Sequence, residues 1–468
     1  MKWETVIGLE THIELSTASK VFCSCGTKFG GEPNSNVCPV CLGHPGVLPS
    51  LNRQAVEFTV TAGLALGCEI ARVSYMDRKH YFYPDMTKAF QTSQFHAPLC
   101  IGGSVTLSSG RTIRLNHIHL EEDAGKLIHD RGRTLIDYNR AGVPLMELVG
   151  EPDLRSAAEA SEYLELLQSI VRNAGVSDCR MQEGSMRCDV NVSVRPEGSE
   201  TLGTRTEVKN LNSFASVRQA IEFEVSRQIE VLESGGRVIQ ETRGFNAASG
   251  ETASMRDKEN SDDYRYFREP DIITVRLTDA DVERLRSALP ETPQARAKRY
   301  VAESGLTESD AALLSKYRKV AEFYDVAAKV NAKLAASFIL TKLFAEVSTE
   351  VAREEWNLKF DAAAFSELVA LTDSGTLSRD AAKRVLSAML ETGRSPQSIV
   401  ERDGIGGAVN VDALCTAAIA DNPAAVRDYL AGKEKALQSL IGAVMKASKG
   451  QAPIEEVKSA LLRAIDAH

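Results

Sequence analysis

A change in sequence character near Pro293 constrains the fold of this chain more than any other feature. Before this residue the sequence has short alternating runs, turns and many glycines, and after it Ala, Leu, Lys and Glu dominate at helical spacing. Strands followed by isolated helices, without regular strand–helix–strand repetition, favour an α+β fold over a doubly wound parallel sheet. We therefore expect a sheet domain over residues 1–293, an all-α helical domain over 294–408 and a helical tail domain over 409–468, with three tail helices from about Val411.

Three segments of the sheet domain show the alternation of half-buried strands. Residues 189–194 place three valines on one face and Asp, Asn and Ser on the other. The segments 5–15 and 114–122 each gather acidic and imidazole side chains on one face. In the first segment these are Glu10, His12 and Glu14; in the second, one face carries His117, His119 and Glu121 and the other carries Asn116 and Glu122.

Two helices are expected within the sheet domain. A capping box at 156–159 precedes an apolar stripe that ends near Gly175. A second apolar stripe runs through 213–233 and stops at a pair of glycines. Strands and helices therefore share this domain.

Charge and hydropathy exclude some classes of protein. Lys and Arg number 55 against 64 Asp and Glu, a net charge of −9, which argues against a general nucleic-acid coat but leaves room for a local basic patch. The segment 432–450 is such a patch, either a solvated helix face or an RNA-contacting tail. We see no apolar run long enough to cross a bilayer and no signal peptide, so we expect no membrane partner and a cytoplasmic location.

Four of the nine cysteines lie in one short segment at about 22–42. Cys23, Cys25, Cys38 and Cys41 have the spacing C-x-C-x12-C-x2-C. Two close thiol pairs joined by a Gly/Asn/Pro-rich loop predict a structural tetrahedral zinc site. The alternative is a set of buried or incidental thiols.

The acidic and imidazole residues of three segments suit Mg²⁺ or Mn²⁺ at a phosphate-handling site, if the fold brings them together. They are Glu10, His12, Glu121, Glu122, Asp123 and Glu147. For any one of these acids, a surface carboxylate or a buried ion pair is an equal alternative. P-loop, Rossmann, kinase and G-x-S-x-G signatures have no match in the sequence.

Eight stretches in consistent order resemble the B subunit of the bacterial glutamyl-tRNA(Gln)/aspartyl-tRNA(Asn) amidotransferase, over nearly the whole chain. They are 4–12 (ETVIGLETH), 77–85 (DRKHYFYPD), 119–126 (HLEEDAGK), 137–147 (DYNRAGVPLME), 183–191 (EGSMRCDVN), 207–213 (EVKNLNS), 262–267 (DDYRYF) and 444–450 (VMKASKG). Arg268 and Gly150 depart from the family pattern, in places that leave the candidate ligands intact.

The resemblance implies a mainly antiparallel-sheet cradle domain at 1–293 and a two-step reaction on misacylated tRNA. Mg²⁺-ATP phosphorylates the side-chain carboxylate of the esterified Glu or Asp, and ammonia then displaces the phosphate to give the amide. The ammonia comes through a tunnel from the amidase, which is the A subunit of the same complex, and the small C subunit is the third member. The implied enzyme is an ATP-dependent ligase with glutamine as amide donor, active as a heterotrimer.

The resemblance also implies residue roles. His12, Glu122 and Glu147 would hold the catalytic Mg²⁺, with Glu10 beside them. Residues implied at the ATP or aminoacyl end are Asp189, Asn191, Glu207, Lys209, Asn210, Lys79, Tyr81, Tyr83 and Arg265. The tyrosines have a core strand as an equal alternative. Lysines implied at the tRNA body are Lys433, Lys435, Lys446 and Lys449.

Two other functions remain open at this stage. A zinc-containing scaffold that binds tRNA without chemistry would have no need of acids converging on an exposed strand face. A free-standing metal-dependent hydrolase would act without ATP. Zinc occupancy, the number of Mg²⁺ ions and the choice between Glu-tRNA(Gln) and Asp-tRNA(Asn) do not follow from the sequence.

Overall fold

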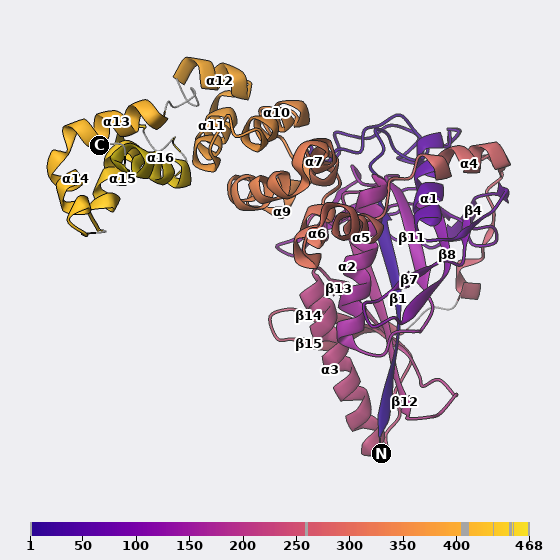
Figure 1. Ribbon diagram of the computed structural model, residues 1–468. Helices are drawn as coiled ribbons and strands as arrows, with labels where there is room; N and C mark the ends of the chain where they lie inside the picture. Colours follow the sequence, from indigo (N-terminus) through magenta and orange to yellow (C-terminus); the bar gives the residue numbers. More distant parts are fainter. Residues whose placement is uncertain are drawn as a thin grey trace. The chain divides into compact units, whose positions relative to one another are not determined.

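The computed structural model describes residues 2–257, 261–403, 411–433, 435–448, 452 and 454–466. The chain forms two compact units, Met1–Thr292 and Pro293–His468. The first unit contains the sheets, and all regular elements described in the second are helical (Figure 1). The expected α+β class is confirmed. Across the described residues, every helix is too short or too polar to span a bilayer.

The first unit is built on a ten-stranded sheet in the order β15-β14-β13-β12-β1-β11-β8-β6-β2, with β7 paired to β8. The strands are β1 (Trp3–Glu14), β2 (Glu69–Ile70), β6 (Cys100–Ile101), β7 (Ser104–Thr106), β8 (Thr112–Glu122), β11 (Pro144–Gly150), β12 (Met186–Pro196), β13 (Thr206–Leu211), β14 (Glu241–Asn246) and β15 (Glu251–Asp257). All pairings are antiparallel except β13 with β14, as expected for a mainly antiparallel sheet.

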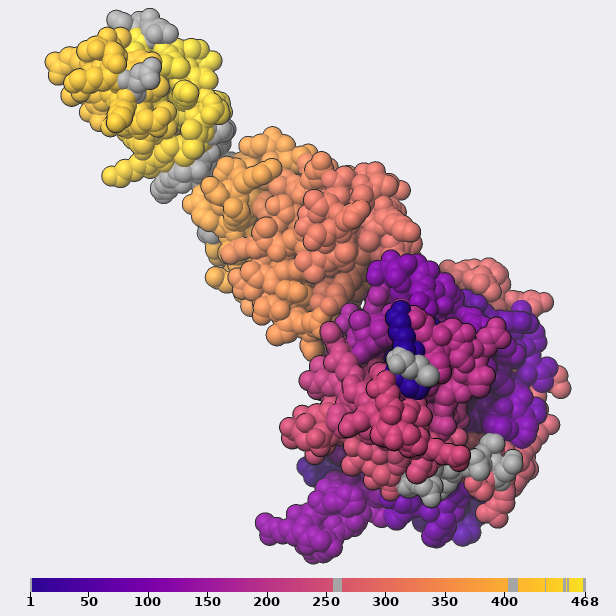
Figure 2. Space-filling model, turned by 90° about the horizontal axis from the view of Figure 1, so that it is seen from below, coloured from indigo at the N-terminus to yellow at the C-terminus, as the bar shows by residue number. Residues whose placement is uncertain are grey.

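Smaller sheets surround it. The hairpin of β9 (Lys126–Asp130) and β10 (Arg133–Asp137) is exposed along most of its length and projects as a purple arm in Figure 2. A three-stranded sheet joins β4 (Asp77–His80), β5 (Phe90–Ser93) and β16 (Phe267–Arg268), the last of which follows the short helix η1 (Ser261–Tyr264). The last pair joins β3 (Val73–Ser74) and β17 (Val275–Arg276).

Four longer helices, α1 (Arg53–Ala65), α2 (Ala157–Ala174), α3 (Phe214–Glu233) and α4 (Asp279–Ser287), complete the described part of this unit. The apolar side chains of β1, including Ile7, Leu9 and Ile13, form one core with the apolar faces of these helices. One half of the expected capping box is present, since Ser156 accepts the backbone N–H of Glu159, whose carboxylate accepts instead from the backbone N–H of Arg155. The expected stop is confirmed, because α2 ends at Gly175 with φ of 75°. The helices therefore cover the apolar face of the sheet, and its polar face is available for functional residues.

The second unit has two hydrophobic clusters. The first cluster is formed by α5 (Pro293–Ser304), α6 (Glu308–Ser315), α7 (Arg318–Phe338), η2 (Ile339–Leu343), α8 (Phe344–Glu346), α10 (Ala362–Asp373), α11 (Arg379–Thr392) and α12 (Pro396–Asp403). The short helix α9 (Glu350–Glu355) contacts α7 but contributes no buried residue. The second is formed by α13 (Val411–Asp421), α14 (Pro423–Leu430), α15 (Lys435–Ala447) and α16 (Ile454–Asp466). Four described helices thus replace the expected three, because Pro423 begins a separate short helix. The expected boundary at 408/409 lies outside the described residues.

Candidate functional site

The polar face of the sheet crosses five adjacent strands, β13, β12, β1, β11 and β8. On β1, His12 lies opposite Glu147 of β11, which in turn lies opposite His119 of β8. On the other side of β1, Glu10 lies opposite Asp189 of β12. Strand register thus brings together residues that are more than a hundred positions apart in the sequence.

His12, His119, Glu121 and Glu147 form a compact group that we name the His–Glu cluster. Nε2 of His12 lies 3.5 Å from Oε2 of Glu147 and 3.8 Å from Oε1 of Glu121. Nε2 of His119 lies 3.3 Å from Oε2 of Glu147 and 3.5 Å from Oε2 of Glu121. Ligand atoms of His12, Glu121 and Glu147 all lie within 4.8 Å of one another. This donor set of two carboxylates and an imidazole fits a divalent cation such as Mg²⁺ or Mn²⁺.

The charges of the cluster are strongly coupled. Burial disfavours the charged imidazoles, but the carboxylates of Glu147 and Glu121 outweigh it and raise the pKa of His12 to about 9 and that of His119 to about 10. Burial likewise disfavours the ionised Glu147, yet the two imidazoles hold its pKa well below the usual value. A cation that binds here must therefore displace protons from imidazole nitrogens.

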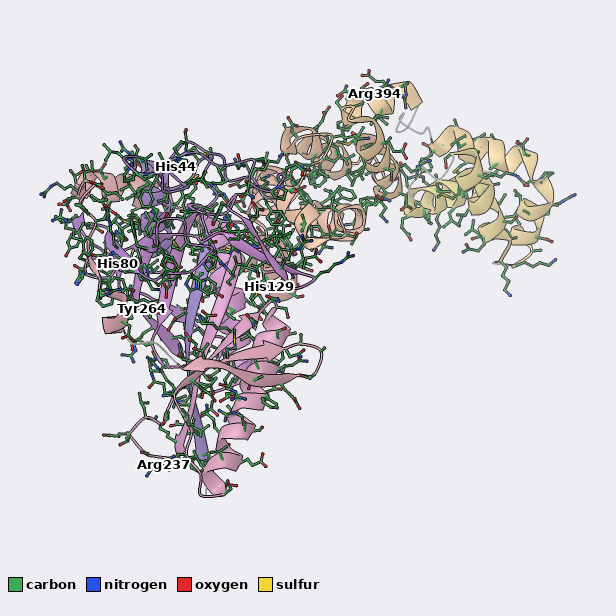
Figure 3. The ribbon with its side chains drawn as sticks, turned by 180° about the vertical axis from the view of Figure 1, so that it is seen from behind. His44, His80, His129, Arg237, Tyr264 and Arg394 are labelled. Carbon is green, nitrogen blue, oxygen red and sulfur yellow. The ribbon has the colours of Figure 1, made fainter. Side chains whose placement is uncertain are left out.

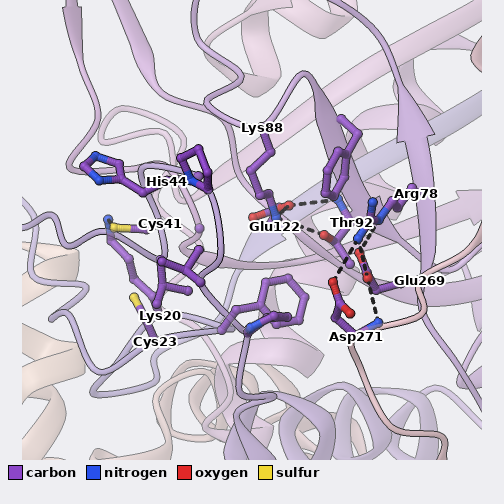
Figure 4. Close-up of a pocket in the computed structure, with 18 of the residues that line it drawn as sticks. Lys20, Cys23, Cys41, His44, Arg78, Lys88, Thr92, Glu122, Glu269 and Asp271 are labelled. Atoms are coloured by element: carbon purple, nitrogen blue, oxygen red, sulfur yellow. Dashed lines mark hydrogen bonds and ion pairs between the residues drawn. The ribbon is translucent and has the colours of Figure 1, made fainter.

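Glu122, which the resemblance implied as a magnesium ligand, lies outside the His–Glu cluster. Successive side chains of a strand point to opposite faces, so Glu121 and Glu122 leave β8 in opposite directions. Oε1 of Glu122 accepts a 2.8 Å hydrogen bond from the backbone N–H of Thr92 and pairs with Lys88 (Figure 4). The structure therefore brings Glu121, and not Glu122, to His12 and Glu147.

A second polar group lies beside the cluster on β1, β12 and β13. Nδ2 of Asn191 donates a 3.0 Å hydrogen bond to Oε1 of Glu10. Nζ of Lys209 lies 2.6 Å from Oδ2 of Asp189 and 3.6 Å from Oε1 of Glu207. Burial disfavours the ammonium, but these two carboxylates raise the pKa of Lys209. The structure thus fixes a positive charge on the same polar face.

A cavity of about 460 Å³ adjoins this polar group. Glu10 and Asn191 line it together with Gly8, Ser193 and Arg205. Asn210, the remaining residue implied on β13, is exposed and has a left-handed backbone with φ of 67°. Four of the five implied β12 and β13 residues therefore form one group with Glu10, and Asn210 lies at its edge.

The residues implied at the aminoacyl end come from two segments that meet. Nζ of Lys79 lies 4.9 Å from the ring centre of Tyr264, and Tyr81 meets the same ring edge-on at 6.5 Å. Figure 3 shows Tyr264 and His80 on the same side of the unit, and Nδ1 of His80 lies 3.1 Å from the carbonyl oxygen of Arg265. The tyrosines therefore lie on an aromatic surface and not in a core strand.

Tyr266 connects this surface with the His–Glu cluster. Its ring stacks on Phe95 with centres 4.2 Å apart. Burial raises the pKa of Tyr266, and the charges of Glu121 and Glu147 raise it further. Tyr83 points outward, with 54% of its surface exposed next to Phe82 at 92%.

The four clustered cysteines meet as their spacing predicts. The sulfur atoms of Cys23, Cys25, Cys38 and Cys41 lie within 4.8 Å of one another, a set that fits Zn²⁺. A hydrogen bond from Cys23 and the charge of Lys20 help to lower the pKa of Cys41 to about 4, against the opposing effect of burial. This is the thiolate form that metal binding requires.

A cavity of about 320 Å³ separates the cysteine loop from β4 and β5 (Figure 4). Lys20 and Cys41 line one side and Arg78, Lys88 and Glu122 line the other. The guanidinium of Arg78 donates hydrogen bonds of 2.6 and 2.8 Å to the carboxylate of Glu269. This cavity contains the implied Glu122 but none of the His–Glu cluster.

The tail lysines are on the surface of the second unit. Lys435 and Lys446 are exposed on α15, and Lys433 pairs with Asp428 at 2.9 Å. Lys449 lies outside the described residues.

Two residues that the implied roles omit are His119 and Glu121. Alternation along 114–122 already placed both on one face, so the signal for them was present. Tyr266 belongs to the 262–267 stretch of the resemblance, but only the fold brings it to Phe95.

Comparison with known proteins identifies the family of this chain. Residues 5–283 match the family model described as GatB/GatE catalytic domain, and residues 321–465 match the one described as GatB domain. The chain is similar to proteins named as the B subunit of aspartyl/glutamyl-tRNA(Asn/Gln) amidotransferase. It is 50% identical to that of Thermoanaerobacter pseudethanolicus over 460 residues and 48% identical to that of Caldicellulosiruptor saccharolyticus over 464, with 97% of both chains covered in each case. The chain therefore belongs to the family of aspartyl/glutamyl-tRNA(Asn/Gln) amidotransferase B subunits.

Proposed function

We propose that this chain forms the amide in a tRNA-dependent amidotransferase. It transfers the γ-phosphoryl group of ATP to the side-chain carboxylate of Glu or Asp esterified to tRNA, releasing ADP. Ammonia then attacks the acyl phosphate and phosphate leaves, which gives Gln-tRNA(Gln) or Asn-tRNA(Asn). The observation that carries this proposal is the His–Glu cluster on the polar face of a sheet.

The chain's own residues supply positions for each reactant. His12, Glu121 and Glu147 would hold Mg²⁺, which would neutralise charge on the transferring phosphoryl group. Asn191 orients Glu10 beside them, and Lys209 brings a fixed positive charge to the same face, suited to phosphate oxygens. Phosphoryl transfer requires from the protein mainly charged groups held in position.

The adjoining cavity is the place we propose for the nucleotide. Its volume of about 460 Å³ and its contact with Glu10 and Asn191 suit an ATP whose phosphates extend toward the His–Glu cluster. The aromatic surface of Tyr81, Tyr83 and Tyr264, with Lys79 and Arg265, would receive the 3′ end, since aromatic rings stack on unpaired bases. Tyr266 would lie between the two regions.

Partners complete the proposed enzyme. The relatives are named as one member of a multi-subunit enzyme, which supports a heterotrimer with the amidase (A) and small (C) subunits, acting in the cytoplasm. We propose structural Zn²⁺ at the four cysteines, and contact of the tail lysines Lys433, Lys435, Lys446 and Lys449 with the tRNA body.

Amidation of Glu-tRNA(Gln) by the assembled complex tests the proposal, with ammonium chloride as nitrogen donor and Mg²⁺-ATP present or withheld. Glu121→Gln should lower the rate at least about 100-fold, because a lost metal ligand removes several kcal/mol of charge stabilisation. Binding of tRNA should stay within a few-fold. Glu122→Gln is the matched comparison on the neighbouring position, and it should retain the metal dependence of the wild type.

Three results would contradict the proposal. An unchanged rate in Glu121→Gln would remove the cluster from catalysis. Product formation without ATP would favour a hydrolase-like activity, and tRNA binding without any product from the intact complex would favour a scaffold.

A further inference from the structure

Arg187 of β12 continues a row of polar side chains that crosses the sheet through the His–Glu cluster. Residues directly opposite one another in an antiparallel pair lie on the same face of the sheet. On one side of β1, Arg187 lies opposite His12, and on the other side Glu147 of β11 lies opposite the same histidine. Strand register therefore places a guanidinium on the polar face, in the same row as two of the proposed metal ligands.

A buried acid anchors this arginine. Nη2 of Arg187 pairs with Oδ2 of Asp123, and Nε of Arg140 lies 3.6 Å from the same oxygen. Arg140 in turn donates hydrogen bonds of 3.0 and 2.9 Å to the backbone carbonyl oxygens of Ala124 and Gly125. Because Arg140 fixes Asp123 to the backbone, the pair with Asp123 holds the guanidinium of Arg187 in a defined place.

The anchored guanidinium keeps donors for a ligand. A guanidinium has five N–H donors in a fixed fork. Arg187 directs Nη2 to Asp123, whereas its Nε has no hydrogen-bond partner among the described residues. Burial disfavours its charge, but Asp123 and Glu14 outweigh burial and raise the pKa of Arg187, so it stays charged. Since 34% of its side-chain surface is exposed, an anion on the polar face can reach it.

The place of Arg187 along the sheet selects one reactant. Glu10 lines the cavity proposed for the nucleotide, and His12 follows on the same face, about 7 Å further along β1. Arg187 faces His12, so it lies at the level of the proposed metal ligands, where the terminal phosphoryl group would be transferred. In that step the bond from phosphorus to the bridging oxygen of ADP breaks and the bond from the substrate carboxylate to phosphorus forms. Negative charge stays on the three equatorial oxygens, and a guanidinium fork matches two of them.

We propose that Arg187 is a catalytic residue that donates hydrogen bonds to the phosphoryl group as it passes from ATP to the side-chain carboxylate of the esterified Glu or Asp. This inference rests on the proposed function and deepens it, because it assigns the positive charge that stabilises the transferring group to a residue of this chain. Arg187 neither gains nor loses a proton in the step. Asp123 is then a positioning residue, since it fixes the guanidinium before the substrates bind.

Formation of ADP in a single turnover measures phosphoryl transfer by itself. The assembled complex is mixed with Mg²⁺-ATP and Glu-tRNA(Gln) without a nitrogen donor. Arg187→Ala should slow this step at least about 1,000-fold, because arginines in this role contribute about 10³–10⁵-fold. Arg187→Lys keeps the charge but lacks the fork, so its rate should lie between those of Arg187→Ala and the wild type. Guanidinium chloride at millimolar concentration should restore part of the rate of Arg187→Ala, which methylammonium chloride should not do.

Arg195→Ala is the matched control. Arg195 lies further along the same face of β12, where its Nε is 2.6 Å from Oε2 of Glu4, and it has no part in the proposed site. Its loss should leave ADP formation within a few-fold of the wild type. A decrease as large as that of Arg187→Ala would show that any arginine lost from β12 impairs the sheet, and the inference would fall.

Other outcomes are equally decisive. Unchanged ADP formation in Arg187→Ala overturns the inference even if amide formation falls, because the arginine would then act on the ammonia step. A loss that guanidinium does not restore overturns it too, since Arg187 would then only maintain the structure of the site. If Arg187→Ala does not fold, a wild-type rate in Arg187→Lys rejects the contact of the fork. All these results leave the proposed function standing, whereas amidation by the wild type without ATP would remove the proposed function itself.

Discussion

Replacing Lys20 by Met tests how a buried ammonium acts on the four-cysteine cluster. Lys20 is fully buried, and its Nζ lies 3.6 Å from Sγ of Cys41 and 3.3 Å from the carbonyl oxygen of Tyr138. Four thiolates around Zn²⁺ carry a net charge of −2, so a neighbouring positive charge stabilises the loaded site. Met has a similar length and no charge, so it removes this interaction while filling most of the same space.

The structure sets the size of the effect. Coulomb's law at 3.6 Å with an effective dielectric constant of about 20 gives about 4–5 kcal/mol for one ammonium and one thiolate. This energy corresponds to a change in zinc affinity of about three powers of ten, and it is an upper bound. Residues that contact metal ligands commonly contribute about 10–100-fold in metal affinity. We expect Lys20→Met to weaken zinc binding at least about 10-fold.

Zinc transfer to a chromogenic chelator measures this loss, at several chelator concentrations and constant pH. Lys28→Met is the matched control, because Lys28 is exposed in the same segment. Equal zinc retention by Lys20→Met and the control would refute the electrostatic role of Lys20. Equal losses in both would point to a general weakening of the loop.

Further perturbations address the fold of the first unit. Gly203→Ala should destabilise it by about 1–3 kcal/mol, since a Cβ there would lie 2.2 Å from the carbonyl oxygen of Val194; urea unfolding measures this. Zinc removal by a chelator should lower its melting temperature in calorimetry, because the cysteine loop loses its cross-link. Burial raises the pKa of Glu269, but the hydrogen bond and charge of Arg78 outweigh burial and hold this pKa below the usual 4.5. The ionised Glu269 therefore stabilises the folded state above pH 4.5. This stabilisation is lost as the pH falls through the lowered pKa. Glu269→Gln should therefore cost about 1–3 kcal/mol at pH 7, because Arg78 keeps Asp271 as a second partner, and the difference from wild type should shrink below pH 4.5. A constant difference would contradict this reasoning.

Local patterns predicted much of the sheet unit. Alternation located β1 and β12 and assigned Glu10, His12 and Asp189 to polar faces, because side-chain direction in a strand depends only on parity. The cap at Ser156 and the stop at Gly175 located α2, because both act within a single turn of the chain. The spacing of the cysteines likewise predicted that their sulfur atoms meet, because all four lie in one short loop.

Local sequence patterns could not predict the long-range features of the site. The pairing of His12 with Glu147, and of Glu147 with His119, depends on register between strands distant in sequence. Parity places Glu121 on the same face as His12 and Glu147, whereas the resemblance implied the magnesium role for Glu122, which points the other way. The contact of Tyr266 with Phe95 depends on two segments distant in sequence meeting, and it has no local signature.

The position of β1 in the sheet has a consequence for biosynthesis. β1 precedes both of its partners, β11 and β12, in the chain, and about 170 residues separate its end from the start of β12. At elongation rates of about 5–20 residues per second, this strand waits roughly 10–35 s for its second neighbour. Each helix of the second unit closes its backbone hydrogen bonds within itself, so it can form as it emerges. We expect the nascent N-terminal strand to be the part of this chain that most needs protection by a ribosome-associated chaperone.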